Sequence, residues 1–172
     1  PDTVIRLKEA FRKNFAEIPK NGPDGEEGLT YSFAHKNAFF IGLDQYVGGQ
    51  HKIHQGWFER QLAGNRQPHV FVYGHEPAFG ARHRDNLGFY PSDRDAFWNA
   101  LGRAGGRIYF CGHDHFYNRA LIDDEAGHPI RQIIVGTGGG SLKQWSGLYQ
   151  DGKSVRGERH ESGRNGYALV TV

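Results

Sequence analysis

Three histidines lie just beyond the glycines that end two apolar runs. The segment Val70-Phe71-Val72-Tyr73-Gly74 leads to His75, and the run 108–111 leads through Gly112 to His113, Asp114 and His115. Neutral imidazole is the commonest protein ligand for ions of the zinc, iron and manganese class. A single histidine among the ten of this chain is most simply a surface residue or a hydrogen-bonded core residue. Two strand-glycine-histidine sequences, one of them with alternate histidines, instead favour a metal site.

The two apolar runs predict where these imidazoles lie. Residues 69–73 and 108–111 are typical of buried strands, and the glycine after each run lets the backbone turn sharply. Side chains at the carboxyl ends of neighbouring strands converge on the crevice where α/β folds bind ligands. We therefore expect His75, His113 and His115 to meet in space, with His113 and His115 aimed in different directions, as two neighbouring metals require.

The remaining pattern predicts an α/β sandwich, a mixed sheet with flanking helices. Apolar residues at spacings of three and four predict a helix over 3–15, and a second helix is expected over 54–62. Ser92 and Asp95 resemble a capping box that opens a third helix, ending near Leu101. Two hairpins are expected, one over 30–34 and 38–43 and one over 120–123 and 129–135. A glycine-rich segment over 136–166 then precedes a last strand, 167–172.

Composition bounds the kind of protein. The chain has 172 residues, 37% of them hydrophobic, which is enough for one packed core and one domain. The 21 lysines and arginines and the 19 acidic residues are interspersed and leave a formal charge of +2, so nucleic acid is not indicated as a partner. No apolar stretch approaches the length of about 18 residues that spans a membrane, so a soluble chain is expected. The chain begins at Pro1 and contains no methionine, so we expect a processed or truncated piece.

Two blocks carry a resemblance to a known family. Gly74-His75-Glu76-Pro77 and Gly112-His113-Asp114-His115 resemble the fourth and fifth signature blocks of the calcineurin-like metallophosphoesterases. Three further segments resemble the purple-acid-phosphatase-like members more weakly and occur in the same order as in those proteins. They are a hairpin, the helix after it and a late glycine loop, here 31–44, 55–62 and 136–139. The similarity therefore covers most of the chain.

The resemblance implies a metal-dependent hydrolase of phosphate esters, either a phosphatase or a phosphodiesterase. In that family the histidines matching His75 and His113 bind one metal ion, and the histidine matching His115 binds the other. The cofactors implied are two divalent or trivalent ions of the iron, manganese or zinc class. Such a pair, about 3.5–4 Å apart, polarises the ester and activates water. Relatives of this type are often exported, but the sequence leaves the location unknown.

The family's earlier blocks, Asp-x-His, Gly-Asp-x-x-Asp and Gly-Asn-His, are absent from the sequence, and Gly64-Asn65-Arg66 is a near match in the wrong place. Those blocks supply the bridging aspartate and the histidine that assists catalysis, so we expect the catalytic residues upstream of residue 1. Residues 1–172 then form a single partial domain that is weakly active or inactive. Its exposed sheet edges would favour self-association. The alternative is a non-catalytic module that binds metal or another protein.

Three further residues are candidates near the site. Asp114 is either a hydrogen-bond partner of an imidazole or, more simply, a solvent-facing residue. Tyr117 either lines a substrate pocket or belongs to the core. Arg82, in a charged loop with His83, Arg84 and Asp85, either contacts a substrate phosphate or is solvated. No role is assigned to the other histidines outside the two blocks, at positions 35, 51, 54, 69, 128 and 160.

Overall fold

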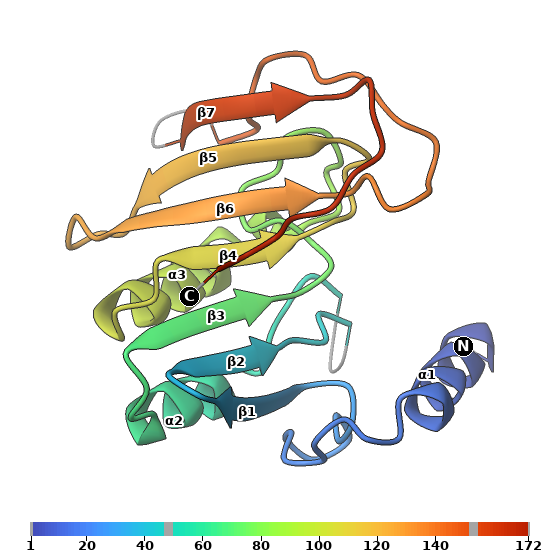
Figure 1. The fold of residues 1–172 in the computed structure, drawn as a ribbon, viewed down its shortest axis with the longest axis vertical. Helices are drawn as coiled ribbons and strands as arrows, with labels where there is room; N and C mark the ends of the chain where they lie inside the picture. The colour runs from blue at the N-terminus through green and yellow to red at the C-terminus, as the bar shows by residue number, and fades with distance from the viewer. Residues whose placement is uncertain (1, 47–49, 152–154, 172) are drawn as a thin grey trace.

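The computed structural model describes residues 2–46, 50–151 and 155–171, and it shows one mixed sheet with two helices packed against one face (Figure 1). The helices are α1 (Asp2–Asn14), α2 (Gln55–Gly64) and α3 (Pro91–Arg103), with a short 3-10 helix at Leu87–Phe89. The strands are β1 (Tyr31–His35), β2 (Ala38–Gly42), β3 (His69–Tyr73), β4 (Ile108–Cys111), β5 (Tyr117–Asp123), β6 (Pro129–Val135) and β7 (Val155–Glu161).

The sheet has the spatial order β1-β2-β3-β4-β6-β5-β7. Its centre is parallel, because β2, β3, β4 and β6 run in one direction. β1 pairs antiparallel with β2, and β5 pairs antiparallel with both β6 and β7. The fold class expected from the sequence, an α/β arrangement with a mixed sheet, is confirmed.

The predicted start of α3 was wrong. Tyr90 occupies the N-cap position without a side-chain hydrogen bond, and Pro91 is the first helical residue. Ser92 therefore lies inside the first turn and is no cap. Proline suits this place because its missing N–H would have no partner in the first turn of a helix.

The last strand was also predicted wrongly. Residues 167–171 form no strand, and Tyr167 and Leu169 are 87% and 85% exposed. The final strand is β7, inside the segment that the glycine content had marked as loop. Its sequence, Val-Arg-Gly-Glu-Arg-His-Glu, lacks apolar alternation, and pairing with β5 defines it, with a register shift between Arg119 and Ala120. β5 itself begins three residues before the expected start.

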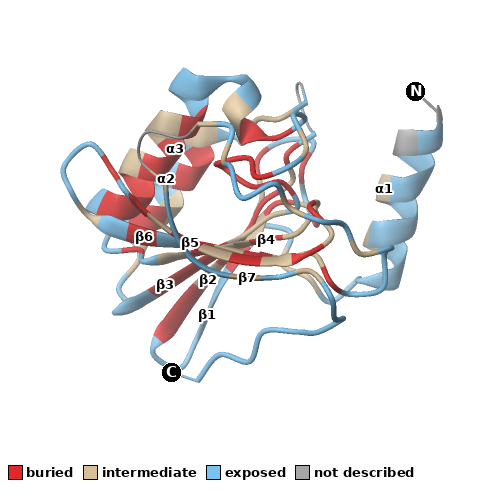
Figure 2. Ribbon diagram, turned by 90° about the horizontal axis from the view of Figure 1, so that it is seen from above, coloured by how far each residue is buried: buried red, intermediate tan, exposed pale blue. Residues whose placement is uncertain are grey.

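One face of the sheet carries the main core. Trp57 and Phe58 of α2 and Phe97 and Trp98 of α3 pack over the inward side chains of the central strands (Figure 2). The opposite face is also apolar, as expected for parallel strands. There Phe33, Phe40 and Phe71 stack across three strands with ring centroids 5.0 and 5.4 Å apart. The C-terminal segment crosses only part of that face.

α1 forms as predicted, but its apolar side chains are not packed in a core. Ile5 is 55% exposed and Leu7 is 65% exposed, and the helix stands apart from the sheet (Figure 2). Polar contacts attach it, from Lys8 to Asp44 and from Arg12 to the carbonyls of residues 25 and 27. Among the helices of the described segments, none is long and apolar enough to cross a membrane.

The outer strand β7 is attached by a charged group. Glu158 of β7 accepts two hydrogen bonds of 3.1 Å from Arg131 of β6 and lies 2.8 Å from Arg119 of β5. The Arg131 hydrogen bonds outweigh the effect of burial and lower the pKa of Glu158 below its usual 4.5.

Because the folded state holds Glu158 ionised, we expect its contribution to be complete above pH 4.5 and lost as the pH falls below that value. The contribution should be about 0.5 kcal/mol, since the pair is partly exposed. Urea unfolding as a function of pH should show Glu158→Gln less stable than the wild type at neutral pH and equal to it near pH 3. The control Glu125→Gln, in an exposed turn, should follow the wild type throughout; equal behaviour of the two variants would contradict the prediction.

Candidate metal centre

The parallel pairing of β3 with β4 brings the two glycine-histidine sequences together. The hydrogen bonding continues beyond the strands, from Gly74 N to Phe110 O at 3.1 Å and from Gly112 N to His75 O at 2.9 Å. As a result, Nε2 of His75 lies 3.2 Å from Nδ1 of His113. These two imidazoles meet at the carboxyl edge of the sheet, as predicted from the sequence.

His115 faces the glycine-rich loop. Its Nδ1 lies 3.1 Å from the carbonyl oxygen of Ser141, and a Cβ on Gly140 would come within 2.7 Å of its ring. Burial, followed by the neighbouring imidazoles of His113 and His115, lowers the pKa of His75, while Asp85 opposes the shift. The neutral form of His75, which is the form that binds metal, is therefore favoured.

The backbone of His113 is strained. Its φ is 65°, in the left-handed region that residues other than glycine rarely adopt. The turn is closed by a hydrogen bond of 2.7 Å from Asp114 N to Gly112 O. Such strain costs about 1–3 kcal/mol, persists only where the surroundings enforce it, and is concentrated at functional sites.

The simpler expectation, that Asp114 faces solvent, was wrong. The residue is fully buried, and its Oδ2 and Oδ1 accept the backbone N–H groups of Arg82 at 3.1 Å and His83 at 2.9 Å. Its closest imidazole nitrogen is Nε2 of His83, at 4.0 Å, beyond hydrogen-bond distance. A buried carboxylate must be satisfied, and here it fastens the charged loop against the turn that carries His113.

That loop brings His83 and Asp85 close to His113. Asp85 Oδ1 lies 3.3 Å from His113 Nε2 and 3.7 Å from His83 Nδ1. The rings of His83 and His113 have centroids 4.7 Å apart. One ligand atom from each of His83, Asp85 and His113 fits within 4.8 Å of the others, so the three form a group able to hold a metal ion. From the sequence, this loop was expected either to contact a substrate phosphate or, more simply, to be solvated, and nothing in it placed His83 and Asp85 beside His113.

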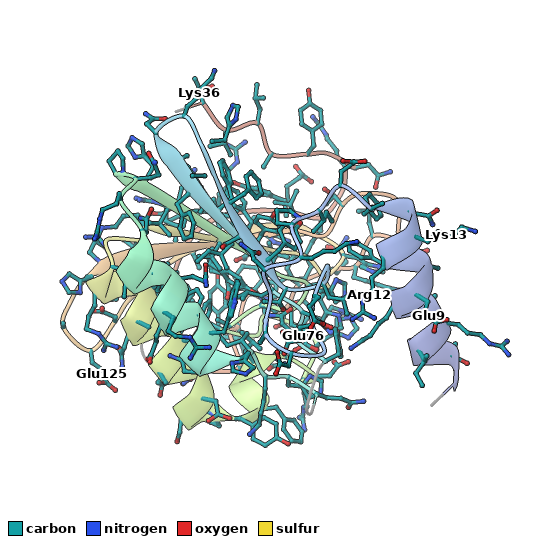
Figure 3. The ribbon with its side chains drawn as sticks, turned by 90° about the horizontal axis from the view of Figure 1, so that it is seen from below. Glu9, Arg12, Lys13, Lys36, Glu76 and Glu125 are labelled. Carbon is teal, nitrogen blue, oxygen red and sulfur yellow. The ribbon has the colours of Figure 1, made fainter. Side chains whose placement is uncertain are left out.

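Hydrogen bonds from buried side chains hold the backbone that follows His75. Glu76 is fully buried, and its Oε1 lies within hydrogen-bond distance of His51 Nδ1, at 2.8 Å. Its backbone N–H donates to Gln45 and its carbonyl accepts from Tyr109. Figure 3 shows Glu76 among interior side chains, whereas Lys13 and Glu125 lie at the periphery. Neither Gln45 nor His51 was singled out from the sequence.

The two remaining candidates lie apart from this group. The guanidinium of Arg82 is exposed and donates to the carbonyl of Gln144 at 3.0 Å. Tyr117 lines a groove with Phe110 and Leu169, on the sheet face opposite α2 and α3. Tyr117 is thus neither fully in the core nor grouped with the histidines.

Known proteins resemble this chain in fold. The purple acid phosphatase PPD1 from yellow lupin (Lupinus luteus) seeds superposes with a TM-score of 0.61 and 16% identity, over 83% of this chain and 28% of that one. GAP50, described as the anchor in the inner membrane complex of Plasmodium, superposes with a TM-score of 0.51 and 20% identity, over 77% of this chain and 42% of that one. PhoD superposes with a TM-score of 0.51 and 15% identity, over 75% of this chain and 33% of that one. No protein-family model and no curated protein matches the sequence.

These likenesses confirm the resemblance to the purple-acid-phosphatase type of metallophosphoesterase at the level of the fold. The chain corresponds to less than half of the length of each of the three structures. One of the three is named as a phosphatase, and another is described as an anchor.

Gly136 is the point where the late glycine loop touches the histidine turn. A Cβ at this position would lie 1.8 Å from the carbonyl oxygen of Asp114, and that backbone cannot yield without moving His115. Gly136→Ala should therefore cost about 3 kcal/mol of unfolding free energy in urea titrations. Gly138→Ala is the matched control, since nothing lies within 4 Å of its Cβ, and it should cost about 0.5 kcal/mol or less. Equal stability of the two variants would contradict the contact.

Proposed function

We propose that this chain is the C-terminal portion of a metal-dependent phosphate ester hydrolase, a phosphatase or phosphodiesterase with a dinuclear metal centre. His75 and His113 would bind one ion and His115 the other, and both ions would be of the iron, manganese or zinc class. The observation that carries the proposal is the separation of 3.2 Å between His75 Nε2 and His113 Nδ1.

That separation fits two ligands of one ion. Nitrogens bound at about 2.0–2.1 Å in neighbouring positions of a tetrahedral or octahedral ion lie about 2.8–3.4 Å apart. The lowered pKa of His75 supports the same assignment, because it keeps a lone pair available. When bound, a metal pair supplies Lewis-acid polarisation of the ester and activation of water.

The residues of this chain mainly position the proposed ligands and supply little charge to the metal ions. Asp114 and the hydrogen bonds around Glu76 hold the two histidine turns in place. Imidazole ligands carry no negative charge, so they would not balance the charge of two cations, and the carboxylate ligands of a complete centre would come from outside residues 1–172. We assign no catalytic residue within this chain. Arg82 is retained as a candidate contact for a phosphate group, since its side chain is exposed and its backbone N–H is held by Asp114, between the two histidines of the turn.

The test is metal binding and turnover by the chain as it stands. Titration with Co²⁺ or Zn²⁺ should show binding that weakens at least tenfold in His75→Ala and in His113→Ala. With manganese, iron or zinc added, hydrolysis of an aryl phosphate and an aryl phosphodiester should stay close to the uncatalysed rate. His35→Ala, on the far end of β1, is the control and should bind as the wild type does. Robust turnover would mean that the essential ligands lie within this chain.

A non-catalytic role is the second candidate. The observation that favours it is the likeness to GAP50, a protein of this fold described as an anchor. In that case the chain would serve as a metal-binding or protein-interaction module. Restoring a complete ligand set by adding the rest of a longer protein would then produce no hydrolysis, whereas the enzyme proposal expects turnover to appear.

We also propose that the chain self-associates through its sheet edges. β1 and β7 are the two edge strands. β7 is rich in charged residues, which discourage pairing, whereas β1 carries Phe33, which is 38% exposed. β1 is therefore the edge on which association is expected.

Light scattering at rising concentration should show dimers or larger species for the wild type and mainly monomer for Phe33→Lys. Leu148→Lys, which changes an exposed residue beside β7 at the opposite edge of the sheet, should behave as the wild type does. A wild-type chain that stays monomeric at high concentration would contradict the association.

A further inference from the structure

The imidazole of His113 has a different neighbour at each nitrogen. Nδ1 lies 3.2 Å from His75 Nε2, and Nε2 lies 3.3 Å from Asp85 Oδ1. A neutral imidazole carries one proton and one lone pair, so its two nitrogens cannot play the same part. Which nitrogen holds the proton decides whether the lone pair points at His75 or at Asp85.

The group that faces Nε2 of His113 is a carboxylate, and an ionised carboxylate can only accept a hydrogen bond. The side chain is 15% exposed, and Nε2 is buried without a hydrogen bond of good geometry to any residue in the described segments. An unsatisfied buried N–H costs about 1–3 kcal/mol. The carboxylate of Asp85 faces this nitrogen and is 58% exposed, so a small rotation completes the hydrogen bond at little cost.

Asp85 is placed there by its loop. Asp114 holds the N–H groups of residues 82 and 83, as described above. The buried Asn86 donates to the carbonyl of His83 at 2.6 Å and accepts from Gly88 N at 2.8 Å. Gln150 donates to the same His83 carbonyl at 2.8 Å. Both sides of the residue pair 84–85 are therefore fastened to the body of the protein.

We propose that Asp85 is a positioning residue for His113, whose carboxylate accepts the Nε2 proton and thereby presents the Nδ1 lone pair to the metal shared with His75. This inference rests on the proposed function for the identity of that metal. A carboxylate on the far nitrogen of a ligating histidine fixes the tautomer and the ring orientation and makes the ligand more basic.

The competing arrangement uses the same residues as direct ligands. An ion held by His83, Asp85 and His113 Nε2 would fit the close grouping of their ligand atoms. It would leave the Nδ1 proton of His113 pointing at His75 and would remove His113 from the ion that His75 binds. The two arrangements differ in the tautomer of His113 and in the part played by His83.

The first measurement is the tautomer of His113 in the metal-free chain, from ¹H–¹⁵N spectra of protein labelled at the histidine ring. The His113 signals are identified by their loss in His113→Gln. We expect the proton on Nε2 in the wild type. In Asp85→Ala it should move in part to Nδ1, where His75 Nε2 accepts it. A wild-type proton on Nδ1, or a tautomer that Asp85→Ala leaves unchanged, would overturn the proposal.

The second measurement is the affinity for Co²⁺ and Zn²⁺, with the cobalt spectrum as a report on the ligands. Asp85→Ala should weaken binding about 10- to 100-fold without changing the shape of the spectrum, and Asp85→Glu should restore part of the loss. His83→Ala, a control in the same loop that keeps the backbone bond to Asp114, should stay within about twofold of the wild type. If His83→Ala weakens binding as much as Asp85→Ala and alters the spectrum, the two are ligands and the positioning role is wrong.

The two measurements separate this inference from the proposed function. A wild-type chain that binds neither ion would refute the metal assignment, while the tautomer of the metal-free chain would still decide the role of Asp85. Circular dichroism and the melting temperature of each variant show whether a loss of binding follows from unfolding.

Discussion

Hydrogen bonds between β3 and β4 run past the last paired residues of both strands, so the glycine and histidine that follow each strand are still held in register. This is the constraint on which the candidate site depends. A parallel pair directs both carboxyl ends to one edge, and the glycines allow both chains to turn there. His75 and His113 meet because two strands 38 residues apart in sequence end at the same level.

The buried carboxylate of Asp114 adds a third segment to this edge. Its neighbours in sequence are the two site histidines, and its hydrogen bonds reach the loop that carries His83 and Asp85. A buried charge is tolerated only where it is hydrogen-bonded. The same residue thus connects the strained turn at His113 with the loop opposite it, and the geometry of one depends on the other. This explains how a loop rich in charged residues is ordered beside the site.

Two features of the chain agree with a molecule completed from outside residues 1–172, as the proposed function requires. The helices cover one face of the sheet, whereas the aromatic stack of Phe33, Phe40 and Phe71 on the other face is only partly covered. The three imidazoles likewise bring no negative charge, which the two cations of the proposed centre would need. The fold likeness covers most of this chain but only 28% of the lupin phosphatase. Packing and chemistry therefore point in the same direction.

The sequence by itself determined the local elements and the placement of the glycine-histidine turns, because apolar periodicity and glycine act over a few neighbouring residues. Strands 69–73 and 108–111 have the predicted bounds, and the resemblance in motifs led to the correct fold. Only the tertiary structure decided that β7 is a strand, that Asp114 is buried and that Asp85 reaches His113. Each of these depends on contacts between segments about 30 residues apart, or on the path of a loop, and no local pattern of residues encodes such a path.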